Sequence, residues 1–375
     1  MIGIVRTLKR TVAAAALAAA ALVGTAQAQY GSDPFFDQTV TQSRGFGLEL
    51  MHARLLLLET YGIAPEGLDE TVEGLEADLA RFGGTLAATA PDVAEALEEA
   101  IEAIEDGFKD GENLTGLVAI ARGAHADAYA AVIPAEVRAS PAYRAGVMAD
   151  LLLAEGGVAE GVEEAIEEDE PWMYPLGWAA LQRVEELWAG LAQFATAEQD
   201  SFAQQYLDTL RDIYPAATLP DVFPSNPEEA ESPAQSLVGI VESVADAALY
   251  PGRDVRRLAP HLETVVAQAC EAYAGGNDAV AFEHVLVVGD LYDAHLTDFL
   301  ALVAGDVDDA VTDMLGALGY GGDDDDDEAG EGEGAEAGDE DDDEDDDDVA
   351  LADDPAAACG ELLEALEEAS AVLGG

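Results

Sequence analysis

Basic residues are scarce in this sequence. Its 375 residues include 15 lysines and arginines against 79 aspartates and glutamates, and the formal net charge is −64. Proteins bind nucleic acids mainly through lysine and arginine contacts to phosphates, so this charge argues against a nucleic acid as the partner. A charge of this size destabilises a compact fold by self-repulsion in dilute buffer, but molar salt screens it because the Debye length falls to about 3 Å. We therefore predict a salt-adapted, halophilic protein.

Long apolar runs are also absent. No segment approaches the uninterrupted stretch of about 18 apolar residues that predicts a transmembrane helix. The apolar stretch Thr11–Val23 follows a basic segment, Arg6–Arg10, and precedes Ala26–Ala28, which has the small-residue pattern of a signal-peptide cleavage site. We expect residues 1–28 to be removed on export, leaving a periplasmic or extracellular protein without a membrane span. A retained N-terminal anchor is the alternative.

Cysteine occurs only at Cys270 and Cys359, and both fall on apolar faces of expected helices. An even number of cysteines in an exported chain favours a disulfide. We predict a Cys270–Cys359 bridge that fastens the last helix to the helix around 262–274. Two buried free thiols, or a bridge to another chain, remain as alternatives.

Catalytic and metal-binding motifs are lacking as well. There are only five histidines, and no zinc-protease pair, haem attachment motif, nucleophile elbow or glycine-rich phosphate loop is present. Glu49 and His52 have the E-x-x-H spacing of di-iron bundles, but those sites need two such steps, so we interpret this one as a chance match. His295 and Asp298 lie one helical turn apart and begin a metal site only if another helix completes it. Acidic residues are so abundant that pairs of carboxylates carry no information about catalysis.

What the sequence does contain is apolar residues at helical spacing over most of its length, which predicts an all-α protein. We expect antiparallel helical hairpins that form a bundle or a short α-solenoid, with a disordered acidic loop and a C-terminal helix. The expected divisions after the signal peptide are an N-terminal helical region at 29–213, a proline-rich linker or loop at 214–233, a C-terminal helical region at 234–320, an acidic tract at 321–348 and the last helix at 349–375.

A faint internal repeat supports the hairpin arrangement. Leu151–Ile166 aligns without gaps on Leu300–Leu315, with matching glycines at Gly156 and Gly305. A glycine turn followed by a small residue is similar to the helical hairpins of tetratricopeptide-like solenoids. We expect a glycine-closed turn between two helices in both copies, and chance similarity between alanine-rich helices is the alternative.

The acidic tract 321–348 has no basic or aromatic residue. Such a segment cannot bury enough apolar surface to fold by itself, so we predict a disordered spacer. The alternative is diffuse, weak binding of Ca²⁺ or Mg²⁺, because hard cations prefer carboxylate oxygens. No ligand spacing defines a single site. The representative ligands are Asp323, Asp324, Asp325, Asp341, Asp342 and Asp343.

The most ligand-like aromatic pair is Trp172 and Tyr174, which lie between Pro171 and Pro175. Aromatic residues on a rigid segment are typical anchors in binding sites, so these two are candidates for a binding lip. The alternative is that they plug the core.

These features favour an exported, salt-adapted, non-enzymatic interaction or structural protein with a protein partner and no cofactor. The alternative is a divalent-cation-binding protein that acts through its acidic tract. An uncharacterised hydrolase or metal enzyme is the third interpretation, and no residue pattern supports it. The oligomeric state is left open.

Overall fold

The structure, a computed structural model, describes residues 39–61, 68–167, 170–218, 226–247, 255–321 and 354–374, together with Pro224, Leu249 and Ala352. Over these residues the protein is all-α, as predicted, with fifteen α-helices and no strand. The predicted signal peptide and all of the acidic tract except Gly321 lie outside the described residues. Within the described part, no helix is long and apolar enough to cross a membrane.

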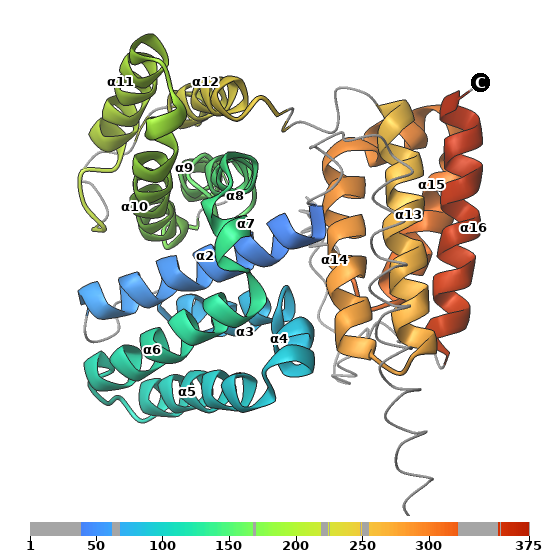
Figure 1. Cartoon of the computed structure of the whole chain (residues 1–375), viewed down its shortest axis with the longest axis horizontal. Coiled ribbons are helices and arrows are strands. Elements are labelled where there is room, and N and C mark those ends of the chain that lie inside the picture. The colour runs from blue at the N-terminus through green and yellow to red at the C-terminus, as the bar shows by residue number, and fades with distance from the viewer. Residues whose placement is uncertain are drawn as a thin grey trace, which may run out of the picture.

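Eleven helices share one large apolar core and form what we call the N-terminal body (Figure 1). They are α2 (Thr39–Tyr61), α3 (Leu68–Ala80), α4 (Gly83–Thr89), α5 (Pro91–Lys109), α6 (Thr115–Val132), α7 (Ala135–Ala139), α8 (Pro141–Leu153), α9 (Glu160–Glu167), α10 (Met173–Leu191), α11 (Ala197–Ile213) and α12 (Glu228–Ala245).

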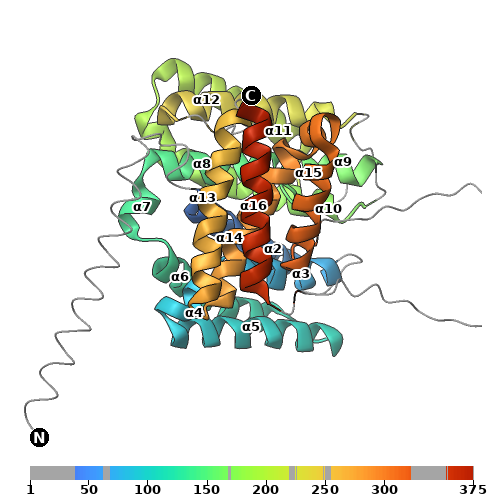
Figure 2. The same ribbon diagram turned by 90° about the vertical axis from the view of Figure 1, so that its right-hand side faces the viewer.

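The other four helices enclose a second core and form the C-terminal bundle: α13 (Val255–Ala274), α14 (Asp278–His295), α15 (Thr297–Ala317) and α16 (Pro355–Gly374). The last helix, α16, packs between α13 and α15, as Figure 2 shows. Its buried face carries Leu362, Leu366 and Leu373, which recur at helical spacing.

Several helices begin at a residue whose polar side chain accepts a hydrogen bond from a free amide of the first turn, a signal that is visible in the sequence. Ser140 accepts from the amide of Tyr143 at the start of α8. Thr196 and Gln199 form a reciprocal capping box at the start of α11. Asp354 accepts from the amide of Ala357 at the start of α16. These local signals fix helix boundaries without reference to the rest of the fold.

The predicted linker at 214–233 differs from the structure at its end. Helix α12 begins at Glu228, and its first amide donates to the side chain of Asn226, so the helix starts within the predicted linker and Pro233 lies inside it. Pro233 is buried against the N-terminal body, to whose core α12 belongs. The change from one core to the other therefore falls between α12 and α13, later than we predicted.

The two segments of the predicted repeat also differ. Gly156 has a φ of +71° and lies in the turn between α8 and α9, as expected for a glycine-closed hairpin. Gly305 instead lies inside α15, next to Ala304, whose backbone leaves the helical region at a kink. The second copy is therefore a kinked helix and not a two-helix turn.

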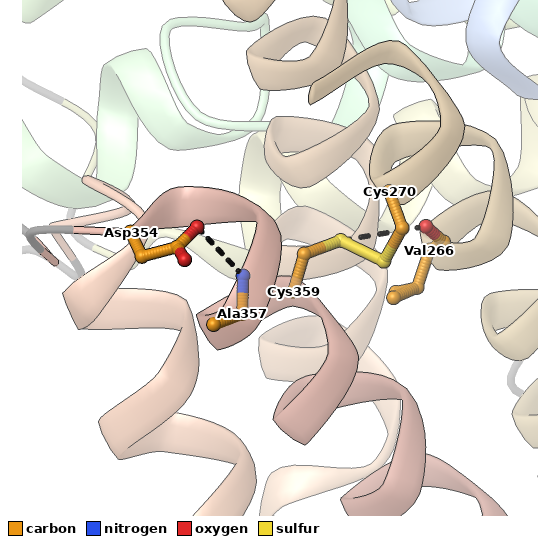
Figure 3. Close-up of a disulfide and its surroundings, with 5 residues drawn as sticks. All are labelled: Val266, Cys270, Asp354, Ala357 and Cys359. Atoms are coloured by element: carbon orange, nitrogen blue, oxygen red, sulfur yellow. Dashed lines mark hydrogen bonds between the residues drawn. A yellow bond between two sulfur atoms is a disulfide. The ribbon is translucent and has the colours of Figure 1, made fainter. Parts of the chain in front are cut away.

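The structure places Cys270 and Cys359 in a disulfide, with their Cα atoms 5.5 Å apart (Figure 3). The bridge joins α13 to α16 near the start of α16, which is the pairing that the sequence predicts. Sγ of Cys359 also lies 3.6 Å from the carbonyl oxygen of Val266, a contact only, because a disulfide sulfur has no proton to donate. The bridge fastens the C-terminal helix to the bundle across a sequence separation of 89 residues.

Helix α14 joins the bundle to the N-terminal body. The buried carboxylate of Glu283 accepts from Nε of Arg44 at 2.7 Å, and from the amide and hydroxyl of Thr85 at 2.6 and 2.7 Å. Close approach is possible because Gly84 faces the backbone of Ala279, where an added Cβ would lie 2.4 Å from the carbonyl carbon. These contacts hold the two parts together beside a large cleft.

Candidate functional site

A cavity of about 870 Å³ forms a cleft between the N-terminal body and the C-terminal bundle. We call it the inter-body cleft. Its size falls within the range of small-molecule sites, about 300–1,000 Å³. The lining comes from α2, α3 and α8, from the residues around Gly156 and Trp172, from α14 and from the segment that follows α15. Its principal side chains are Gln42, Ser43, Phe46, Leu50, Arg54, Asp78, Arg81, Asp150, Glu155, Trp172, Met173, Phe282, Leu286, Asp290, Leu291, Asp293 and Tyr320.

One part of the lining is apolar and aromatic. Phe46 lies beneath the guanidinium of Arg81, whose central carbon is 5.4 Å from the ring centroid. Trp172 and Phe282 are partly exposed and line the cleft from the N-terminal body and the bundle, respectively. Aromatic side chains of this kind bind apolar groups, and they bind cations over the faces of their rings.

Two carboxylates in the cleft are paired with arginines. Oδ2 of Asp78 accepts from Nε of Arg54 at 3.1 Å, and Arg81 pairs with Asp290 across the junction of the two parts. Burial of Asp78 nevertheless outweighs both arginines and raises its pKa to about 6. The arginines of the cleft are therefore engaged by carboxylates of the cleft itself.

Two other carboxylates accept hydrogen bonds from uncharged groups. Asp150 accepts from the side-chain amide of Gln42 at 3.0 and 2.9 Å, and Asp293 accepts from the hydroxyl of Tyr320 at 2.7 Å. The pKa of Asp150 is raised to about 7, chiefly by burial, and Asp290 adds to the effect. Burial also raises the pKa of Asp293. A cation bound beside them would favour their ionised forms.

A further polar group in the cleft is unsatisfied. The hydroxyl oxygen of Ser43 is buried and has no hydrogen-bond partner in the structure. Such groups are rare in proteins because each costs about 1–3 kcal/mol.

The structure separates the two residues of the predicted binding lip. Trp172 is partly exposed and lines the inter-body cleft. Tyr174 is fully buried, its hydroxyl donates to the carbonyl of Ile213 at 2.7 Å, and its ring centroid lies 4.7 Å from that of Tyr214. Positions 172 and 174 differ because the chain enters α10 between them, which turns the two side chains in different directions. Tyr174 therefore belongs to the core.

The described residues contain no group of three or more histidine, cysteine, aspartate or glutamate side chains arranged to hold a metal ion. His295 lines the cleft, and Glu49 of the E-x-x-H step pairs with Arg183 at 2.7 Å. The six aspartates proposed for Ca²⁺ or Mg²⁺ lie outside the described residues.

Sequence reasoning missed Asp150, Asp290 and Asp293 as site residues. They are three among 79 acids, and no local pattern marks them. Asp150 lies on α8 and the others on α14, so only the packing of the bundle against the N-terminal body brings them to one cavity. Comparison of the chain with protein-family models, with curated proteins and with solved structures finds no match in any of the three.

Proposed function

We propose that this protein is an exported, salt-adapted binding protein that holds a cationic group on an apolar stem in the inter-body cleft. This chemistry is that of a polyamine and of a lysine or arginine side chain presented by a protein partner. The observation that carries the proposal is the combination, in one cavity of about 870 Å³, of an aromatic wall with Asp150 and Asp293, whose hydrogen-bond donors are uncharged.

Charge and burial favour a cation over a neutral ligand. A carboxylate that is partly removed from water regains interaction energy when a positive group binds next to it, and molar salt screens such a short, buried contact much less than it screens surface charges. Trp172 and Phe282 supply the apolar contact for the stem and aromatic faces for the charge. The proposed ligand therefore matches both parts of the lining.

Export is proposed from the signal-like N-terminus, and the disulfide supports it because such bonds persist in oxidising compartments. Salt adaptation is proposed from the net charge of −64. Export and salt adaptation describe where the protein works, and cation binding in the inter-body cleft is the activity proposed for it.

The binding test uses calorimetry with spermidine and with a lysine-rich peptide, in about 2 M potassium chloride, where long-range repulsion is screened. Asp150→Asn should weaken binding about tenfold or more, as expected for loss of a partly buried charged contact. Asp293→Asn should weaken it less, because the carboxylate of Asp293 is exposed and water screens its contact. The matched control is Asp212→Asn, which removes one negative charge from the exposed surface of α11, away from the cleft. Equal affinities in all four proteins would refute the cleft as the site.

The alternative function, divalent-cation binding by the acidic tract, is tested by the same assay. Deletion of 321–348 should leave spermidine binding intact if the cleft is the site. If the tract is the working part, the deletion abolishes Ca²⁺ and Mg²⁺ binding, and the cleft variants have no effect on any ligand.

A further inference from the structure

A second, smaller cavity of about 300 Å³ lies within the N-terminal body, where α2, α6, α7 and α10 meet. It is distinct from the inter-body cleft and shares no residue with it. We call it the arginine pocket, because Arg122, Arg138 and Arg183 line it. The whole chain has only 15 lysines and arginines, so the presence of three at one small cavity is unexpected in a protein with a net charge of −64.

Two of the arginines have carboxylate partners. Arg183 is buried and pairs with Glu49 at 2.7 Å through Nε and with Glu186 through a terminal nitrogen. Arg122 pairs with Glu59. A guanidinium has five N–H donors, so each of these pairs leaves donors for a further acceptor.

Arg138 is different, because no ion pair engages it within the described part of the chain. Its guanidinium lies 5.5 Å from the ring centroid of Tyr129, which also lines the pocket. Its Nε is buried and has no hydrogen-bond partner. An unsatisfied, buried, charged donor is costly and calls for an acceptor.

The two histidines of the pocket are uncharged, so the three arginines are the cationic groups of its lining. His52 and His125 pack edge to face, with ring centroids 5.5 Å apart. The pKa of His52 is lowered to about 3, first by burial and then by the charges of Arg183, His125 and Arg122. Nε2 of His125 lies 2.7 Å from the carbonyl oxygen of Leu48 and must donate to it, since a carbonyl only accepts. Burial also lowers the pKa of His125, so both rings are neutral near pH 7.

From these observations we propose that the arginine pocket binds a small tetrahedral oxyanion, either a free phosphate or sulfate ion or the phosphoryl group of a small monoester. Guanidinium groups match such oxygens with paired N–H donors, and Arg138 lines the pocket with no ion-pair partner among the described residues. The volume of about 300 Å³ is at the lower end of the range for ligand sites and fits a ligand of this size.

Glu186 is the natural competitor for this anion. It lines the pocket and pairs with Arg183, yet its side chain is 68% exposed, so it can move into solvent when an anion takes its place. Glu49 is only 2% exposed and stays with Arg183 as the fixed partner. The structure thus distinguishes a permanent carboxylate from a replaceable one.

The test measures binding of sodium phosphate, sodium sulfate and glycerol 3-phosphate to the full-length oxidised protein by calorimetry. All arms contain the same background of about 2 M potassium chloride, where charge repulsion is screened. Arg138→Gln should weaken binding about tenfold or more through loss of the charged donor. Glu186→Gln should strengthen it severalfold, an effect that impaired folding cannot produce. The control, Arg211→Gln, removes an exposed arginine that pairs with Glu185 and Asp208 outside the pocket, and should leave the affinity unchanged.

A tighter complex with glycerol 3-phosphate than with inorganic phosphate would identify the phosphoryl group of an organic ester as the ligand, and the reverse would identify the free ion. Two results would overturn the proposal. One is binding that neither Arg138→Gln nor Glu186→Gln alters. The other is no binding of any of the three anions above the chloride background.

Discussion

The disulfide provides the first prediction. Cys270 and Cys359 are 89 positions apart, and the closed loop contains the acidic tract 321–348. Reduction, or replacement of both cysteines by alanine, opens this loop. Helix α16 should stay docked, because its apolar face remains packed between α13 and α15. The native contacts then change little, and the loss of stability comes from the greater freedom of the unfolded chain.

The expected magnitude follows from the loop length. For a loop of about 90 residues, the chain-entropy model gives a loss of about 4.6 kcal/mol at 25 °C. Measured disulfides usually contribute somewhat less than this model, about 2–4 kcal/mol. We therefore expect the free energy of unfolding to fall by about 2–5 kcal/mol when the bridge is opened.

The assay is urea unfolding followed by circular dichroism, in about 2 M salt with and without reductant. The double alanine variant should resemble the reduced wild type and should not respond to reductant. If the oxidised and reduced proteins have the same free energy of unfolding, the bridge does not restrict the unfolded chain and the reasoning is refuted.

Three further predictions concern stability. The melting temperature should rise between about 50 mM and 3 M salt as charge repulsion is screened, and equal values would contradict salt adaptation. The pKa of Asp150 is raised from 3.8 to about 7, so the folded state keeps a proton that the unfolded state loses, and stability should fall as the pH rises from about 4 to 7. Asp150→Asn should reduce this dependence, leaving the part due to Asp78, and should stabilise the protein at pH 8 by up to about 4 kcal/mol. An unchanged pH–stability curve would exclude the raised pKa. Trp188 is 2% exposed, so Trp188→Ala should lower the free energy of unfolding by about 3–5 kcal/mol. Trp172 is partly exposed, so Trp172→Ala should lower it clearly less but should weaken ligand binding. Equal losses of stability in the two variants would place Trp172 in the core.

The helices could be predicted from the sequence because their signals are local. Apolar spacing defined the faces, and capping residues such as Ser140 and Thr196 marked the starts. Pro233 misled the reasoning for a physical reason. A proline usually ends or begins a helix, but here it lies within the first turns of α12, and the burial of its ring against the N-terminal body favours that position.

Neither cavity could be predicted, because each depends on residues that are distant in the sequence. Arg138 and Arg183 come from different helices, and nothing near either one marks a site. Asp150 lies in an acidic sequence in which most carboxylates are solvent-exposed, so its partial burial is evident only from the packing of α8 and α14. Lysine and arginine are scarce in this chain, so a group of three arginines at one cavity is more informative than a group of acids.

The most direct test of cation binding in the inter-body cleft is the affinity for spermidine measured by calorimetry from pH 6 to pH 8. A cation binds the ionised form of Asp150, whose pKa is about 7, while the amines stay protonated throughout this range. The account predicts that the affinity of the wild type rises about tenfold across this range and that Asp150→Asn loses most of this rise, leaving the smaller part due to Asp78, whose pKa is about 6. An affinity independent of pH in the wild type, or an undiminished rise in Asp150→Asn, would contradict it.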